Sequence, residues 1–427
     1  MNICVVALGK IGLPLGVQFA AKGHRVIGAD VSERVVELVN DGVVPFPGEA
    51  ELDVKLRDAV TAGLLSATTD TTAAVAESEA VVLVVPLFVD TDGVPDFGWM
   101  DNATRAVAAG LRPGTLVSYE TTLPVGTTRQ RWAPMLESGS GLTAGRDFAL
   151  VFSPERVLTG RIFADLRRYP KLVGGIDAAS ARRGVEFYTS VLDFDERDDL
   201  MRPNGVWDLG SAEAAELAKL AETTYRDVNI GLANQFARFA DTVGVDVIKV
   251  IEACNTQPYS HIHQPGIAVG GHCIPVYPRM LLWNDPAATI VRAAREANAV
   301  MPEYAVQLLA NAYGDLTGAN VLVLGAAYRG GVKETAFSGV FPTVEALRLR
   351  GAVPYVSDPI FGADELTALG LPPYRGEPVT AAVIQADHTE YRTLGAADLP
   401  GIKVLVDGRR VTDPSRWPGV RRVVIGG

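Results

Sequence analysis

Short apolar runs alternate with stretches of helical spacing over the first part of the chain. Residues 2–8 and 25–30 are predicted strands, and residues 12–22 form the helix between them. Further apolar runs of strand length lie at residues 80–86, 116–120 and 149–152. This alternation predicts a parallel sheet with helices on both faces.

The alternation stops at residues 211–241, where apolar side chains recur at helical spacing without a proline. We expect one long helix there and a second helical stretch over residues 287–312. From residue 320 the alternation returns, with predicted strands at residues 321–324, 353–357, 382–385, 404–406 and 422–425. The predicted fold class is α/β, with two Rossmann-like doubly wound domains joined by a long central helix and a helical linking domain.

A glycine-rich turn joins the first predicted strand to the first predicted helix. Ala7-Leu8-Gly9-Lys10-Ile11-Gly12 follows the G-x-G-x-x-G dinucleotide fingerprint, with alanine at its first position. Gly9 would let the backbone approach a pyrophosphate, and Gly12 would let helix and strand pack closely. Asp30 ends the second strand, where a carboxylate holds both ribose hydroxyls and repels a 2′-phosphate. The pattern predicts NAD rather than NADP, although a turn that merely packs would carry the same glycines.

Composition narrows the class of protein. The chain has 427 residues and a net charge of -11. This charge argues against nucleic acid and anionic membranes as partners, because both bind basic surfaces. Three cysteines argue against a disulfide framework, and the chain opens in a strand without a basic, apolar leader. We therefore expect a cytoplasmic protein with no membrane span.

Cys273 lies in a loop rich in glycine and proline, Gly270-Gly271-His272-Cys273-Ile274-Pro275. Such a loop can bend tightly and let a substrate approach a thiolate. Taken alone, it more often holds a structural thiol. Cys4 lies in a predicted buried strand and Cys254 in a helical pattern, where we expect an inert thiol and a core thiol.

Lys219 strengthens the case for chemistry at Cys273. It lies on the predicted long helix and shares a helical face with Thr223 and Arg226. The ordinary alternative is a solvated lysine beside Glu222. A cation near a reacting alcohol would instead stabilise an oxyanion.

Two further motifs follow predicted strands of the first domain, Thr121-Thr122-Leu123-Pro124 and Ser153-Pro154-Glu155-Arg156-Val157. Ligands of open α/β sheets bind outside the carboxyl ends of strands. Glu155 could therefore act as a general base, and Thr122 could bind water or a ribose. We expect no metal, because the histidines near Cys273 match no common zinc spacing.

Taken in order, these motifs resemble those of the UDP-glucose/GDP-mannose dehydrogenase family over nearly the whole chain. Further matching motifs are Glu216-Leu217-Ala218-Lys219-Leu220, Gly325-Ala326-Ala327-Tyr328-Arg329 and Asp407-Gly408-Arg409-Arg410. The resemblance implies a four-electron oxidation of a sugar 6-hydroxymethyl group to a carboxylate, using two NAD. It also implies an NAD-binding domain over residues 1–205, a central domain over residues 206–315 that forms a homodimer, and a nucleotide-sugar-binding domain over residues 316–427.

The resemblance also implies roles for individual residues. Cys273 would be the nucleophile, Lys219 would stabilise oxyanions, Glu155 would assist thioester hydrolysis, and Thr122 would lie near water and cofactor. The residues expected to bind the cofactor are Gly9, Lys10, Ile11, Gly12, Asp30, Arg34, Pro86 and Thr122. Those expected to bind a UDP-linked substrate are Arg156, Val157, Lys219, Thr223, Tyr259, Gly266, Gly270, Tyr277, Tyr328, Arg329 and Arg410.

The motifs around Glu155 and Cys273 look like the branch that acts on UDP-N-acetylhexosamines. The UDP-glucose branch usually has Ala-Glu-Gly where this chain has Leu158-Thr159-Gly160. We therefore favour a UDP-N-acetylhexosamine substrate over UDP-glucose.

Four positions depart from the family pattern. Thr223 replaces an asparagine, Tyr259 an arginine that usually enters from the partner subunit, and Ala336 an arginine. Tyr277 replaces an aspartate, and a neutral tyrosine cannot be the same base. The alternatives are a full dehydrogenase with altered water activation, an oxidation of a non-standard nucleotide sugar that ends at the aldehyde, a non-catalytic NAD- or nucleotide-sugar-binding protein, and a lysine-dependent hydroxyacid dehydrogenase.

Overall fold

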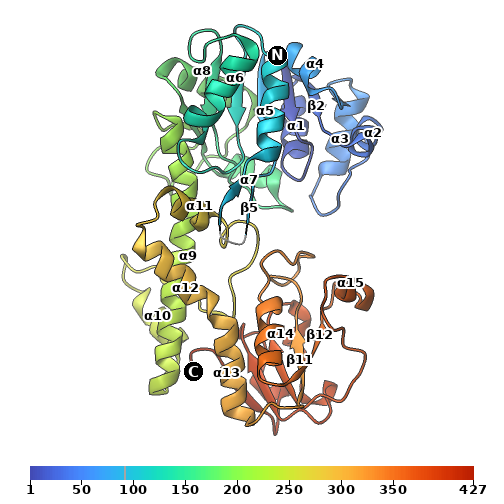
Figure 1. Cartoon of the computed structure of the whole chain (residues 1–427), viewed down its shortest axis with the longest axis vertical. Coiled ribbons are helices and arrows are strands. Elements are labelled where there is room, and N and C mark those ends of the chain that lie inside the picture. The colour runs from blue at the N-terminus through green and yellow to red at the C-terminus, as the bar shows by residue number, and fades with distance from the viewer. Residues whose placement is uncertain (91–92) are drawn as a thin grey trace. The chain divides into compact units, whose positions relative to one another are not determined.

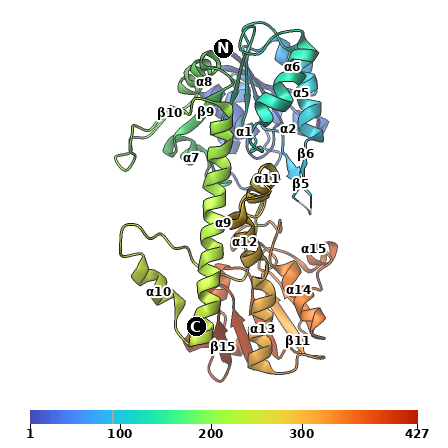
Figure 2. The same cartoon turned by 60° about the vertical axis from the view of Figure 1, so that its left-hand side comes forward.

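The structure is a computed structural model that describes residues 1–90 and 93–427. Its internal contacts divide the chain into two compact units, Met1–Ala221 and Glu222–Gly427. The boundary falls within helix α9 (Ala212–Val243), which Figure 2 shows as one unbroken helix. Lys219 thus belongs to the first unit and Cys273 to the second, while the three-domain division stays a prediction. The long helix predicted over residues 211–241 is confirmed.

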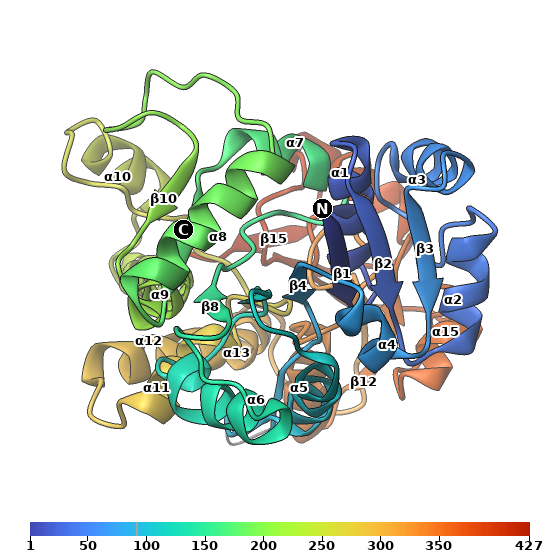
Figure 3. The same cartoon turned by 90° about the horizontal axis from the view of Figure 1, so that it is seen from above.

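The first unit is built on an eight-stranded sheet in the order β10-β9-β8-β7-β4-β1-β2-β3. Figure 3 shows β4, β1, β2 and β3 side by side. The neighbouring strands are parallel except for the antiparallel pair β8 and β9, so the predicted parallel sheet is confirmed apart from this pair. Its strands are β1 (Asn2–Val6), β2 (Arg25–Ala29), β3 (Leu65–Thr68), β4 (Ala80–Leu83), β7 (Leu116–Tyr119), β8 (Ala149–Phe152), β9 (Lys171–Gly175) and β10 (Val206–Asp208).

Helices pack on both faces of this sheet because successive side chains of a strand point to opposite sides. Ile3 and Val5 lie in one core with apolar residues of α1 and α8. On β7, Tyr119 stacks on Trp132 with ring centroids 4.3 Å apart. The remaining elements are α1 (Gly12–Ala21), α2 (Glu33–Asn40), α3 (Leu52–Thr61), α4 (Thr71–Ala76), β5 (Phe88–Val89), β6 (Pro95–Asp96), α5 (Gly98–Gly110), the π-helical η1 (Thr128–Trp132), α6 (Ala133–Ser140), α7 (Ile162–Arg168) and α8 (Ala178–Val191).

The second unit has a five-stranded parallel sheet in the order β12-β11-β13-β14-β15. Figure 1 shows α13 and α14 together against this sheet. The five strands that we predicted here are confirmed to within one residue. They are β11 (Asn320–Leu324), β12 (Val353–Ser357), β13 (Ala381–Ile384), β14 (Val404–Asp407) and β15 (Arg421–Val424).

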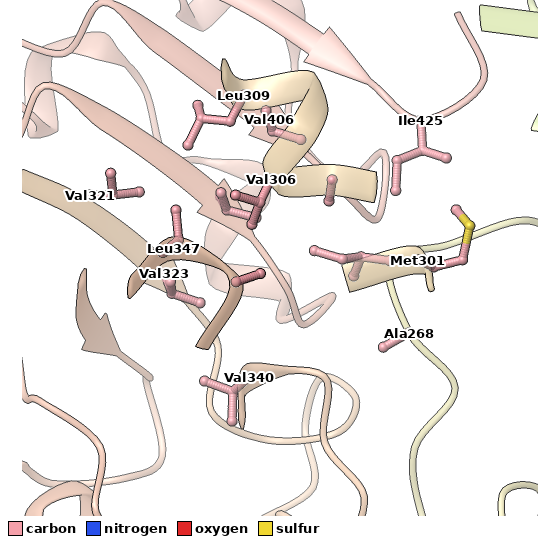
Figure 4. Close-up of a cluster of buried hydrophobic side chains, with 14 of the residues drawn as sticks. Ala268, Met301, Val306, Leu309, Val321, Val323, Val340, Leu347, Val406 and Ile425 are labelled. Carbon is pink, nitrogen blue, oxygen red and sulfur yellow. The ribbon is translucent and has the colours of Figure 1, made fainter. Parts of the chain in front are cut away.

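Alternate residues of these strands enter two different cores. Val321 and Val323 pack with α13 and α14, and Figure 4 shows them near Val306 and Leu347. Leu322 and its alternating neighbours enter a second core on the opposite face. Short elements cover that face. The helices and turns of the unit are α10 (Val247–Cys254), α11 (Tyr277–Asn284), α12 (Thr289–Ala299), α13 (Met301–Tyr313), α14 (Val340–Leu349), α15 (Ala363–Ala368) and the 3₁₀ turns η2 (Thr389–Arg392), η3 (Ala396–Asp398) and η4 (Pro414–Arg416).

The predicted helical stretch over residues 287–312 is confirmed, and it consists of two helices. The cap residue Val300 lies between the end of α12 and the start of α13. Pro302 occupies the first turn of α13, where a missing N–H group costs nothing, whereas inside a continuous helix it would remove a hydrogen bond.

The three cysteines differ in exposure, and all three are free thiols. Cys4 is buried, as predicted, and burial raises its pKa to about 12, which is consistent with an inert thiol. Cys254, predicted to be in the core, is only partly buried, and Cys273 is exposed. Within residues 1–90 and 93–427, no helix combines the length and the apolar character that crossing a membrane requires.

Candidate active site

The glycine-rich turn of the first unit has the backbone that the dinucleotide fingerprint requires. Ala7 adopts a φ of 75°, in the left-handed region that glycine usually occupies. A Cβ atom on Gly12 would lie 1.9 Å from the carbonyl oxygen of Ala7, so only glycine fits. A Cβ atom on Gly9 would meet open space among the described residues, which leaves room for a ligand. The methyl group of Ala7 therefore does not prevent the turn from forming.

Asp30 braces this turn from the end of β2. Its Oδ2 atom accepts a 2.8 Å hydrogen bond from the N–H of Leu8, and its Oδ1 atom accepts one of 2.9 Å from the N–H of Ser32. The turn opens onto the N-terminus of α1, where N–H groups and the helix dipole favour a pyrophosphate. These residues fit NAD, because the carboxylate of Asp30 can accept hydrogen bonds from the ribose hydroxyls.

The second unit repeats this bracing at the end of β12. There, Asp358 Oδ2 accepts hydrogen bonds of 2.7 and 3.0 Å from the N–H groups of Ala326 and Ala327. His388 also contacts this oxygen, at 3.1 Å. The first residue of the turn is Gly325, with a φ of 110°. Both units therefore fasten a strand-to-helix turn to an aspartate at the end of the next strand, a likeness that the sequence did not reveal.

Three other residues expected to bind the cofactor lie elsewhere in the first unit. Arg34 lies on α2, exposed Pro86 follows β4, and buried Thr122 follows β7. The hydroxyl of Thr121 donates a 2.7 Å hydrogen bond to the carbonyl of Val85, which ties the ends of β4 and β7 together.

Glu216, on the first turns of α9, holds the loop after β7. Its carboxylate accepts hydrogen bonds from the N–H of Gly126 at 2.5 Å, the N–H of Thr128 at 2.9 Å and the hydroxyl of Thr128 at 2.7 Å. Burial raises the pKa of Glu216 to about 7, while these donors oppose the rise. Lys219 lies one turn further along and is only 8% exposed, so its side chain is buried and is not the solvated lysine of the ordinary alternative.

Glu155 belongs to a buried charged cluster. Lys171 Nζ donates to Glu155 Oε2 at 2.9 Å and to Glu120 Oε2 at 2.6 Å. Tyr188 donates from its hydroxyl to Glu120 Oε1 at 2.7 Å. Neither Lys171 nor Glu120 was given a role in the prediction from sequence. A lysine that opens an apolar strand was the available signal, because a buried ammonium group requires carboxylate partners.

The cysteine loop of the second unit is held by backbone contacts. Gly271 adopts a φ of 91°, and its N–H donates a 2.8 Å hydrogen bond to the carbonyl of Ala336. A Cβ atom on Gly270 would lie 2.6 Å from the Cβ of Tyr328. Cys273 Sγ lies 3.7 Å from the hydroxyl oxygen of Tyr277, the first residue of α11. Glycine thus lets the loop pack against Tyr328 while the thiol stays exposed.

A pocket of about 190 Å³ lies next to the cysteine loop, within the second unit. It includes Gly266, Gly270, Tyr328 and Arg329, as expected, and also Arg409. Arg409 Nε donates a 2.8 Å hydrogen bond to the carbonyl of Gln385. The neighbouring Arg410 was predicted to bind the substrate instead. Two adjacent arginines indicate a site for an anion, but the sequence does not show which of the two side chains faces it.

Arg410 points away from this pocket. Its guanidinium donates to the carbonyls of Ile425, Gly426 and Gly427 and contacts Asp246 at 2.9 Å. A φ of 53° at Arg410 turns the chain and separates its side chain from that of Arg409.

The remaining predicted substrate residues are spread over both units. Arg156 donates to the carbonyl of Pro170 at 3.2 Å, and Val157 shares a small hollow with it. Thr223 is fully buried on α9, whereas Tyr259 is 91% exposed. His272 Nε2 lies 3.3 Å from a carboxylate oxygen of Glu334. Across the described part of the chain, no three side chains of the metal-binding types are grouped to hold an ion.

Comparison with known proteins shows the family of the chain. The family model "UDP-glucose/GDP-mannose dehydrogenase family, NAD binding domain" matches residues 1–192, and the model of the family's central domain matches residues 213–300. A UDP-N-acetyl-D-mannosamine dehydrogenase of Pyrococcus horikoshii is 35% identical, with 96% of each chain covered. An NDP-N-acetyl-D-galactosaminuronic acid dehydrogenase of Ralstonia solanacearum is 30% identical, with 97% of each chain covered.

A solved structure of UDP-D-ManNAc dehydrogenase from Pyrococcus horikoshii superimposes with a TM-score of 0.87 at 33% identity. The match covers 100% of this chain and 99% of that one. The predicted resemblance, fold class and NAD cofactor are thereby confirmed. The chain belongs to the UDP-glucose/GDP-mannose dehydrogenase family and is an NAD-dependent nucleotide-sugar dehydrogenase.

Proposed function

We propose that the protein oxidises the 6-hydroxymethyl group of a UDP-N-acetylhexosamine to a carboxylate through a covalent intermediate on Cys273. The observation that carries this proposal is the exposed thiol of Cys273 beside the pocket that contains Arg409. Ile274, the residue next to Cys273, lines that pocket. A nucleophile and a pocket with two guanidinium groups therefore adjoin within one unit.

The pocket supports binding of a nucleotide diphosphate. Arg329 and Arg409 supply guanidinium groups, which bind phosphate oxygens in pairs of hydrogen bonds. Tyr328 supplies an aromatic surface for a base or sugar ring. The overall charge of -11 makes such local cations necessary for an anionic substrate.

The chemistry proceeds through two two-electron oxidations. NAD, when bound, accepts the hydride in each of them. After the first, the Cys273 thiolate adds to C6 of the aldehyde, and a C–S bond forms. After the second, the C6 thioester remains. Water then adds to C6 and the C–S bond breaks, which releases the carboxylate, the thiolate and two protons.

Three residues of the first unit support this sequence. Lys219 is a buried cation that would stabilise the alkoxide and the thiohemiacetal oxyanion. Glu155 would take the proton of the attacking water. Thr122, buried at the end of β7, would bind that water or the nicotinamide ribose.

Relatives favour an N-acetylated sugar. The two curated relatives described above are named for N-acetylmannosamine and N-acetylgalactosaminuronic acid. UDP-glucose stays the second candidate. The second candidate outcome is an oxidation that ends at the aldehyde, because Tyr277 stands where the family usually has an aspartate.

A stoichiometric assay tests the covalent route. A panel of UDP- and GDP-sugars is incubated with NAD, and NADH formed per sugar consumed is counted. We expect two NADH per UDP-N-acetylhexosamine for the natural protein and for the control Cys254→Ser. Cys273→Ser should form at most one NADH per sugar and release aldehyde. Two NADH per sugar from Cys273→Ser would contradict the covalent route.

A homodimer through α9 is also part of the proposal. Tyr225, Leu232, Phe236, Phe239 and Val243 recur at helical spacing and are each between 39% and 64% exposed. Such a stripe on one helix suits a partner helix. In sedimentation, the double variant Leu232→Glu/Phe239→Glu should be monomeric, and the control Leu349→Glu, on α14, should stay dimeric. A natural protein that sediments as a monomer would contradict the dimer.

We place the protein in the cytoplasm. Its three cysteines are all free thiols, and a nucleophilic thiol persists best in a reducing compartment. Recovery of the natural protein from a secreted fraction would contradict this assignment.

A further inference from the structure

We propose that Lys171 and Glu120 are positioning residues for the oxidation, because they orient the carboxylate of Glu155 and determine whether it is ionised. The inference rests on the role proposed for Glu155 and deepens it. The three side chains form one cluster in which Lys171 bridges two carboxylates.

The cluster joins three separate segments of the sheet. Glu120 follows β7, Glu155 follows β8, and Lys171 opens β9. The Lys171 side chain is 4% exposed, that of Glu120 0% and that of Glu155 11%. Burial removes the water that would otherwise solvate these charges, so each charged side chain depends on the other two for its stabilisation. Glu155, the most exposed of the three, is the member that a substrate water can reach.

Each carboxylate oxygen in the cluster has a donor. Lys171 donates to Oε2 of both glutamates, Tyr188 to Oε1 of Glu120, and the N–H of Arg156 to Oε1 of Glu155 at 2.7 Å. Two donors on a carboxylate fix its plane and its position. Glu155 is thereby held in one orientation by Lys171 and its own neighbouring backbone.

The other charged groups around Glu155 are already engaged. Asp165, on α7, lines the same hollow and accepts from Arg161 at 2.9 Å and from the N–H of Leu158 at 3.0 Å. Arg156 donates to a backbone carbonyl, and Tyr169 lines the far side of the hollow. The cation that contacts both cluster carboxylates is therefore Lys171.

The charge balance within the cluster separates the two glutamates. Burial raises the pKa of Glu120 to about 7, and the nearby Glu155 carboxylate adds to this rise while Lys171 opposes it. Burial also acts to raise the pKa of Glu155, but the Lys171 ammonium and the hydrogen bond from Arg156 hold it below its ordinary value. The two shifts have opposite directions, so Glu120 takes up a proton more readily than Glu155, and Glu155 is the member of the pair that is kept as an ionised base.

The test measures hydrolysis of the thioester on Cys273. The thioester is formed by incubating the enzyme with UDP-N-acetylhexosamine and NAD. Its hydrolysis is followed from about pH 5.5 to about pH 9. Samples are quenched with acid at intervals, and mass spectrometry measures the fraction of enzyme that is still acylated. Removing the cation in Lys171→Met makes ionisation of Glu155 less favourable. In Lys171→Met we expect the acidic limb of the rate profile to move to higher pH by about one unit or more. In Lys171→Arg, which keeps a cation, the acidic limb should stay where it is in the natural protein.

Glu120→Gln tests the other half of the cluster. In the natural protein, ionisation of Glu120 near pH 7 adds a negative charge beside Glu155 and strengthens it as a base. We expect a rise in rate near pH 7 that Glu120→Gln lacks. At high pH, Glu120→Gln should hydrolyse the thioester at the lower rate that the natural protein shows below pH 7.

The outcomes separate this inference from the role of Glu155. If Glu155→Gln hydrolyses the thioester at the natural rate, the proposed base is wrong. If Glu155→Gln blocks hydrolysis but the profiles of Lys171→Met and Glu120→Gln match that of the natural protein, the positioning role alone is overturned. NAD affinity and the melting temperature check folding. Should Lys171→Met fail to fold, Glu120→Gln decides, and a profile that keeps the rise in rate near pH 7 in this variant overturns the inference.

Discussion

The sulfur atom of Cys273 lies 3.7 Å from the hydroxyl oxygen of Tyr277, one helical turn later in the chain. The N–H of Tyr277 also donates a 2.9 Å hydrogen bond to the carbonyl of Cys273, which keeps the two residues in register. A phenol can donate a hydrogen bond to a thiolate, whereas an ionised aspartate would repel it. Tyr277 is therefore placed to donate to the sulfur of Cys273 once the thiol has lost its proton, although it cannot supply the base that the family's aspartate would.

Tyr277→Phe should slow the reaction of Cys273 with iodoacetamide about tenfold at neutral pH. The reason is the loss of a charge-assisted hydrogen bond to the thiolate, worth roughly 1.5 kcal/mol. Mass spectrometry of the alkylated peptide measures the rate. The control Tyr374→Phe, in the same unit, should react like the natural protein. An unchanged rate in Tyr277→Phe would show that the phenol does not act on the sulfur.

Gly12→Ala should abolish NAD binding, because its Cβ atom would lie 1.9 Å from the carbonyl oxygen of Ala7. Ala7→Gly should leave NAD affinity unchanged and stabilise the protein by up to about 1 kcal/mol, since a left-handed alanine is strained. Calorimetric titration and thermal melting measure the two effects. NAD bound with natural affinity by Gly12→Ala would mean that the turn does not hold the cofactor.

Arg409→Gln and Arg410→Gln should have opposite consequences. Arg409 lines the pocket, so its loss should raise the KM for the nucleotide sugar at least about tenfold with little change in melting temperature. Arg410 binds carbonyls near the C-terminus, so its loss should lower the melting temperature and change KM little. A matching rise in KM in both variants would contradict this assignment.

Glu216→Ala should destabilise the first unit by about 3 kcal/mol, because three buried donors would lose their acceptor. Glu213→Ala is the matched control on the same turn of α9. Its partly exposed ion pair with Arg129 should contribute at most about 1 kcal/mol. Chemical denaturation of both variants measures the difference, and equal losses would mean that Glu216 does not anchor the loop.

Much of this fold follows from local patterns in the sequence. Apolar runs located the central strands of both sheets, since a strand buried on both faces is apolar throughout. Three strands of the eight-stranded sheet, β3, β9 and β10, were not predicted. β9 begins with Lys171 and ends in two glycines, and β10 is short and half-exposed, so neither shows a continuous apolar run.

The sequence by itself determined the dinucleotide turn, the family and the cysteine loop, because each depends on residues adjacent in the chain. Only the tertiary structure decided that Lys171 joins Glu120 to Glu155, that Glu216 holds Gly126 and Thr128, and that Arg409 rather than Arg410 lines the pocket. Glu120 and Lys171 are 51 residues apart, and Glu216 and Gly126 are 90 apart. Such contacts arise because a buried charge must find a partner wherever the sheet brings one, and no local pattern records which partner that is.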